Sequence, residues 1–263
     1  MRLCALEYLR REALEYPACT KSPFLLPFGA ADIRNSYGSW VNNAQTVGPY
    51  ASTGRSGPTC WAYPDMLMVG VGSGSCSGDS CANGVGLPTI VEQRSHFGLW
   101  CILSSPLTLS LDLTNATTTN LVWSIITNVD AIAINQAWAG APGGVFASSA
   151  SNITLQHCTP LWDGDQNCTL PVTQSWYKPL PNGDAAVFIA NHGFDSPSVT
   201  VNFSDVPGLL CAATGTCDVF DIWAQAGVGE HTGFYSVLSL ESHNSVFLRI
   251  SAPSSPDIRV SQE

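Results

Sequence analysis

The chain has 263 residues, of which 45% are hydrophobic and 11% charged, so we expect one large or two smaller globular domains rather than a disordered chain. Its 20 acidic and 10 basic residues give a net charge of −10, which argues against nucleic acid or an anionic membrane surface as a partner. No apolar stretch is long enough to span a membrane, because serines, Pro106 and Asp112 interrupt the most apolar one.

The first sixteen residues predict a short amphipathic helix, with Leu3, Leu6 and Leu9 on its apolar side and Pro17 after its end. Charges run through this segment, and it lacks the uninterrupted apolar core of a signal peptide. Since later features indicate a secreted protein, we expect that the true N-terminus is missing.

Two acidic residues follow at predicted strand ends. Residues 30–33 are predicted to end a strand and to place Asp32 at a rim, and residues 35–45 look like a poorly defined helix or a loop. The stretch from Cys60 to Gly70 predicts a strand that presents Asp65 ahead of a glycine-rich loop.

The next segment alternates between helices and strands. Thr89 and Glu92 form a capping box that begins a helix ending near Leu103. Residues 106–113 alternate between apolar and polar side chains, as a strand should, and residues 115–128 predict a second helix. Residues 129–136 are the last part of this region. This order is typical of an α/β fold.

From about Ser148 the pattern changes to short alternating runs separated by glycine, proline and asparagine. They predict an antiparallel β-sandwich. The clearest of these runs cover residues 185–190, 198–203, 217–223 and 245–250. We therefore expect an α/β domain over 1–147, a β-sandwich over 148–252 and a mobile tail over 253–263.

The ten cysteines indicate the compartment. Three pairs lie close in sequence within polar loops, and we expect them to form disulfides rather than a metal site because no histidine stands at zinc spacing. These pairs are Cys76–Cys81, Cys158–Cys168 and Cys211–Cys217. Four glycosylation sequons add to this indication, at Asn115, Asn152, Asn167 and Asn202. The sequence thus predicts a glycoprotein of the secretory pathway, either extracellular or in a lysosome or vacuole.

Four motifs in this order resemble glycoside hydrolase family 27, the α-galactosidases and α-N-acetylgalactosaminidases (melibiases). The family's Trp-Asn-Asp-Pro-Asp-Met-Leu motif is similar to residues 61–67, and its helix ending in Trp-Ala is similar to 94–103. Its Ala-Pro-Leu…Asn-Asp-Leu strand is similar to 105–113, and its Val-Ile-Ala-Ile-Asn-Gln-Asp segment to 131–136.

The resemblance implies the C-terminal part of a (β/α)8 TIM barrel followed by the β-sandwich, and retaining hydrolysis of terminal α-D-galactosides. It implies that Asp32 is the acid/base, since Ala31-Asp32-Ile33 matches the family's acid/base motif. It also implies that Asp65 and Met66 contact the sugar. The expected partner is an α-galactoside oligosaccharide or glycoconjugate, with no cofactor and no metal.

The sequence also departs from the family pattern. Phe28 replaces the arginine four residues before the acid/base, Ala62 and Tyr63 replace an asparagine and an aspartate, and Ala137 replaces an aspartate. The nucleophile motif, Lys-(Tyr/Phe)-Asp-x-Cys, does not occur in the sequence.

We therefore expect an incomplete copy of the enzyme that lacks the nucleophile half, and a chain that is unstable alone because an open half-barrel exposes strand edges. The alternative is a non-catalytic carbohydrate-binding or structural remnant of such an enzyme. A metal-dependent hydrolase is a third and weaker alternative, because the five histidines show no ligand pairing. The sequence does not separate galactose from N-acetylgalactosamine as the preferred sugar, nor does it give the oligomeric state.

Overall fold

A computed structural model describes residues 32–49, 54, 56–58, 61–71, 89–159, 164 and 166–253. The predicted N-terminal helix, the predicted Cys76–Cys81 disulfide and nearly all of the predicted tail lie outside these residues. None of the helices in the described part of the chain combines the length and the apolar character needed to cross a membrane.

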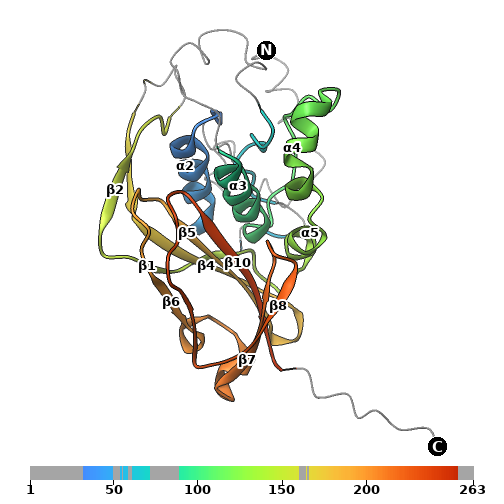
Figure 1. Cartoon of the computed structure of the whole chain (residues 1–263), viewed down its shortest axis with the longest axis vertical. Coiled ribbons are helices and arrows are strands. Elements are labelled where there is room, and N and C mark those ends of the chain that lie inside the picture. The colour runs from blue at the N-terminus through green and yellow to red at the C-terminus, as the bar shows by residue number, and fades with distance from the viewer. Residues whose placement is uncertain are drawn as a thin grey trace, which may run out of the picture.

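Four helices gather on one side of a sheet (Figure 1). They are α2 (Tyr37–Val47), α3 (Ile90–Ile102), α4 (Ala116–Ile126) and α5 (Val129–Gln136). Helix α3 is central, because it contacts the other three helices as well as three strands of the sheet. Nine of its thirteen residues are buried, as expected for a helix enclosed on most sides.

Two predicted helix starts are confirmed, those of α3 and α4. At α3 the Thr89 hydroxyl accepts a hydrogen bond from the Glu92 amide at 3.2 Å, while the Glu92 carboxylate accepts one from the Thr89 amide. Helix α4 begins at the side chain of Asn115, which accepts from the Thr118 amide. The segment predicted as a poorly defined helix or loop is an eleven-residue helix, α2, capped by Ser36.

The strands predicted in the first half of the chain are not formed by the described residues. The expected strand ends at Asp32 and Asp65 and the expected strand over 106–113 are irregular, and the pairing there is an isolated parallel bridge between Leu67 and Leu109. The Leu67 amide donates to Thr108 O at 2.8 Å, and the Ser110 amide donates to Leu67 O at 3.3 Å. A strand needs neighbours to extend a ladder, and one bridge is too short to make it regular.

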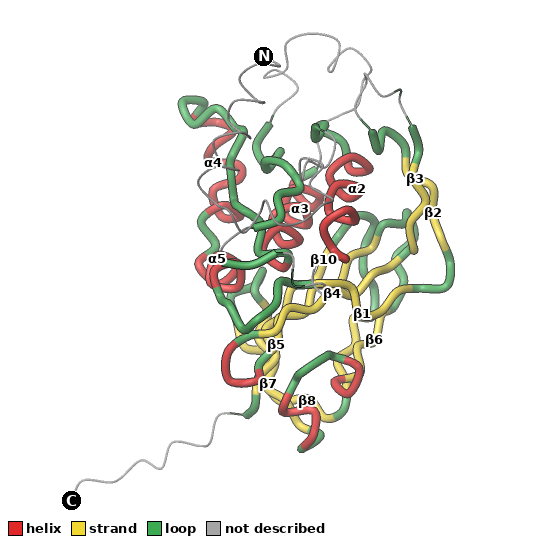
Figure 2. Tube along the Cα trace, turned by 180° about the vertical axis from the view of Figure 1, so that it is seen from behind, coloured by secondary structure: helices red, strands yellow, loops and turns green. Residues whose placement is uncertain are grey.

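A six-stranded antiparallel sheet forms the other half, in the order β1-β4-β5-β10-β7-β8 (Figures 1 and 2). Its strands are β1 (Gly144–Ser148), β4 (Thr173–Pro179), β5 (Ala185–Asn191), β7 (Thr216–Asp221), β8 (Ala226–Thr232) and β10 (Ser245–Ser251). Three of the four alternating runs named above coincide with β5, β7 and β10, and the fourth with β6 (Val199–Asn202), so the predicted antiparallel β-structure is confirmed.

The central strand β5 is buried on both faces. Phe188 and its neighbours on one face pack into the core shared with the helices, whereas Val187 and Ile189 pack into a second core on the opposite face. That second core is closed by β6 pairing with β9 (Phe234–Val237) and by the short 3-10 helices η5 (Phe203–Asp205) and η6 (Leu210–Ala213). The sheet is therefore sandwiched between two apolar layers.

Two of the predicted disulfides are confirmed. Cys158–Cys168 closes the hairpin of β2 (Asn152–Leu155) and β3 (Cys168–Pro171), and Cys211–Cys217 ties η6 to β7. Cys101 is a buried free thiol. The four sequon asparagines are all exposed, as glycosylation requires.

Candidate active site

Two segments far apart in sequence meet at the predicted acidic residues. The Ile33 amide donates a hydrogen bond of 2.7 Å to Oδ2 of Asp65. The structure therefore brings the backbone beside Asp32 against the Asp65 carboxylate, although neither residue lies in a regular strand. A carboxylate that accepts from a backbone amide is held in a fixed direction, which an ordered site requires.

The environment of Asp32 makes its carboxyl group a weaker acid than a free aspartate. Partial loss of hydration and, second, the negative charge of Asp65 both raise the pKa of Asp32 above its usual value, even though the side chain stays exposed at the surface. A carboxyl group with a raised pKa beside a second carboxylate suits a proton donor. The geometry is thus compatible with an acid/base role and leaves Asp32 accessible to a ligand.

Asp65 itself is tightly held. Its Oδ1 accepts from the Met66 amide at 2.8 Å, and its carbonyl oxygen accepts from Nε1 of Trp100 on α3 at 2.9 Å. The next side chain, Met66, is 39% exposed and is free to contact a ligand. All three predicted site residues therefore belong to one locality, while their roles stay predictions.

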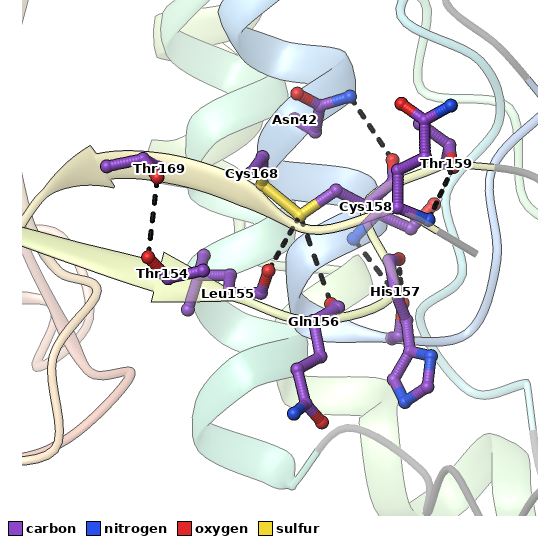
Figure 3. Close-up of a disulfide and its surroundings, with 12 residues drawn as sticks. Asn42, Thr154, Leu155, Gln156, His157, Cys158, Thr159, Cys168 and Thr169 are labelled. Carbon is purple, nitrogen blue, oxygen red and sulfur yellow. Dashed lines mark hydrogen bonds between the residues drawn. A yellow bond between two sulfur atoms is a disulfide. The ribbon is translucent and has the colours of Figure 1, made fainter. Parts of the chain in front are cut away.

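A disulfide-closed hairpin braces the segment that carries Asp32 (Figure 3). Nε of Arg34 donates to Thr159 O at 2.7 Å, and Nδ2 of Asn42 donates to Cys158 O at 3.2 Å. Gly38 makes this approach possible, because a Cβ there would lie 2.2 Å from Gln156 O. The hairpin closed by the Cys158–Cys168 disulfide thus contacts the Asp32 segment through Arg34 and α2 through Asn42, a link that sequence spacing alone does not reveal.

A chain of buried polar side chains that starts at Tyr37 on α2 was not predicted from the sequence. The Tyr37 hydroxyl lies 2.8 Å from Nδ1 of His192, whose Nε2 lies 3.0 Å from Oε1 of Gln174, and the Tyr37 ring stacks on His243. Burial, with a smaller contribution from the charge of His243, lowers the pKa of His192 to about 3, so this histidine is neutral at physiological pH. Tyr37 and His192 are 155 residues apart in sequence, so no spacing signal could have joined α2 to this chain of side chains.

The described residues contain no group of three or more His, Cys, Asp or Glu side chains placed to hold a metal ion. Of the positions that depart from the family pattern, Ala62 is buried, and its amide donates to the Ser56 hydroxyl at 3.0 Å. Phe28 lies outside the described residues.

Comparisons with known proteins agree with this architecture. A family profile described as the alpha galactosidase C-terminal beta sandwich domain matches residues 172–250. An alpha-galactosidase of Lachancea cidri is 30% identical over 189 residues, which cover 70% of this chain and 34% of that protein. Alpha-galactosidase 3 of Arabidopsis thaliana is 25% identical over 213 residues, or 81% of this chain and 40% of that one. The chain thus spans less than half the length of these relatives.

Solved structures share the fold. A putative alpha-galactosidase/melibiase from Bacteroides fragilis superposes with a TM-score of 0.64 at 23% identity, covering 84% of this chain and 41% of that one. Alpha-galactosidase I from Mortierella vinacea gives a TM-score of 0.58 at 22% identity, covering 82% and 46%. Each match covers more than four fifths of this chain, so it extends beyond the β-domain into the helical part.

Proposed function

Because the chain belongs to glycoside hydrolase family 27 and corresponds to the C-terminal part of its members, we propose that it carries the acid/base half of a retaining glycosidase acting on terminal α-D-galactosides. The observation that carries the proposal is the contact between the Asp32–Ile33 backbone and the Asp65 carboxylate. It joins, in space, the two motifs that the family resemblance assigns to proton transfer and to sugar binding.

The proposed fold of the helical part is the C-terminal portion of a (β/α)8 barrel. The parallel bridge between Leu67 and Leu109, with α3 between these segments in sequence, supports it because a parallel pair connected by a helix is the repeating unit of that barrel. The proposed domain boundary at 147 falls inside β1 (Gly144–Ser148), which belongs to the six-stranded sheet, so the sheet favours a boundary a few residues earlier.

The proposed chemistry is a double displacement. Asp32, protonated at first, gives its proton to the glycosidic oxygen while a nucleophilic carboxylate attacks the anomeric carbon. In the second step Asp32 takes a proton from water, which then releases the sugar. The 263 residues contain no Lys-(Tyr/Phe)-Asp-x-Cys motif, so the nucleophile would come from a segment outside this sequence. Asp65 and Met66 would contact the bound galactose unit.

The first test is sugar binding by the 263-residue chain. We expect galactose to bind in preference to glucose and Asp65→Asn to weaken binding about tenfold or more, the loss of one charge-assisted hydrogen bond. Asp195→Asn, which alters an exposed carboxylate in the β-domain, is the matched control. Equal affinity for both sugars, or equal effects of the two variants, would contradict the assignment of Asp65.

The acid/base role needs turnover, and therefore a longer chain that supplies a nucleophile. There, Asp32→Asn is expected to slow alkyl α-galactosides far more than aryl α-galactosides, because an acidic phenol leaves without protonation. Uniform slowing of both substrates would remove Asp32 from the proton-donor role.

A second candidate is a non-catalytic carbohydrate-binding remnant. The absent nucleophile motif and the replacement of the family's arginine by Phe28 favour it. Galactose binding without turnover, in a protein shown to be complete, would support this candidate over the enzyme.

A further inference from the structure

Asp65 adopts a backbone conformation that few side chains accept. Its φ angle is +80°, in the left-handed region that glycine prefers and that aspartate tolerates better than bulkier residues do. Such a conformation persists only where surrounding contacts hold it. The contacts at this position therefore identify the residues that fix the direction of the Asp65 side chain.

Two buried side chains, one from each of two helices, hold the peptide groups at this position. Nδ2 of Asn43 on α2 donates to Pro64 O at 3.1 Å, and Nε1 of Trp100 on α3 donates to Asp65 O at 2.9 Å. Asn43 is 1% exposed and Trp100 is fully buried, so neither donor is free to turn away toward solvent. Buried donors in fixed rotamers are suited to positioning a neighbouring backbone.

The chain after Asp65 is fixed as well. The Leu67 backbone is held through its bridge to Leu109, so the chain is fixed on both sides of Asp65. With both ends held, the Asp65 carboxylate is directed to the Ile33 amide, 2.7 Å away.

A second tryptophan shows that burial alone does not create such a bond. Trp40 on α2 is 1% exposed, and its ring lies edge-on to the Trp100 ring with the centroids 6.5 Å apart. Its Nε1 is buried with no hydrogen-bond partner. Both indoles are buried and adjacent, but only the Trp100 N–H donates a hydrogen bond to the backbone of Asp65.

We propose that Asn43 and Trp100 are positioning residues for Asp65, because they hold the strained backbone that brings its carboxylate to the acid/base segment. This inference rests on the proposed function for its biological meaning, though not for its test. It predicts that removing the Trp100 N–H loosens the contact between Asp65 and Ile33, while removing the Trp40 N–H does not.

The experiment compares Trp100→Phe with Trp40→Phe in the full 263-residue chain. Each change trades a buried indole for a smaller ring, and only the first removes a hydrogen bond. The readout is amide hydrogen exchange at Ile33, taken relative to Ile189 in β5, which reports global opening. We expect about tenfold faster relative exchange at Ile33 in Trp100→Phe and less than about twofold in Trp40→Phe.

Asn43→Leu, which keeps the approximate side-chain volume and removes the donor, gives an independent reading if Trp100→Phe fails to fold. Unchanged relative exchange at Ile33 in the folded donor-deleted variants, or equal acceleration in Trp40→Phe, would overturn the positioning role. Galactose binding is measured separately on the same samples. If Ile33 responds as expected but galactose does not bind, the positioning role stands and the proposed function fails.

Discussion

The helical part and the β-domain differ in how their strand backbones find hydrogen-bond partners. Strand β5 pairs over its whole length with β4 on one side and over residues 185–190 with β10 on the other, and both of its faces are buried. The segments around Leu67 and Leu109 share one parallel bridge, and the α4 side chains of Leu121 and Trp123 are 60% and 54% exposed. The β-domain thus completes its own ladders, whereas the helical part depends on contacts with the sheet.

Those contacts are specific. Lys178 of β4 is fully buried, and its ammonium donates to the carbonyl oxygens of Ile134 and Asn135 at the end of α5, where a helix has free acceptors. Burial lowers the pKa of Lys178 to about 7. Gly98 of α3 lies so close to the sheet that a Cβ there would be 2.6 Å from the Phe188 ring. The sheet therefore serves as the platform on which the helices are ordered.

Truncating one side chain on each face of β5 is the strongest test of whether the helical part depends on the sheet. Phe188→Ala should cost about 3–5 kcal/mol and Ile189→Ala about 2–5 kcal/mol of unfolding free energy, as core truncations of these residues do. Because Phe188 faces the helices, its variant should speed hydrogen exchange in α3 much more than in β7. Ile189→Ala, on the opposite face, should speed exchange in both. Equal effects of the two variants on both elements would mean that the chain unfolds as one unit.

The β-domain was predictable because its signal is local. The runs that became β5, β7 and β10 alternate within six or seven residues, and the two disulfides join cysteines ten or fewer positions apart. The strand predicted over 106–113 failed because a parallel strand is defined by non-local neighbours. The family resemblance alone assigned Asp32 and Asp65 to one site. Their contact through the Ile33 amide, like those of Asn43 and Trp100, depends on three-dimensional packing that no sequence pattern encodes.

Acid should weaken the packing of α3 against α2. Burial lowers the pKa of His96 to about 3, and its ring stacks on Trp40 with centroids 4.9 Å apart. Between about pH 6.5 and 3 the unfolded chain binds a proton at this histidine that the folded chain does not, so stability falls as the pH falls. From pH 7 to 5 the expected loss is about 2 kcal/mol for each such histidine.

His96→Phe keeps an aromatic ring and removes the titrating group, so the loss between pH 7 and pH 5 should be about 2 kcal/mol smaller than in the unaltered chain. Urea unfolding followed by circular dichroism at the two pH values measures this difference. The same slope in both proteins would show that His96 is protonated within the fold and that the contact between α2 and α3 does not exclude charge.

The smallest expected effect concerns the apolar side chains that α4 leaves exposed. Leu121→Gln combined with Trp123→Gln should change the unfolding free energy of the 263-residue chain by no more than about 0.5 kcal/mol, because exposed positions contribute little. Ile125→Ala, at a position of the same helix that is 4% exposed, should cost about 2–5 kcal/mol and serves as the control. A loss above about 1 kcal/mol in the double variant would show that another segment covers this face, since such losses arise from buried positions. The helical part would then be as well enclosed as β5, and the contrast between the two halves would disappear.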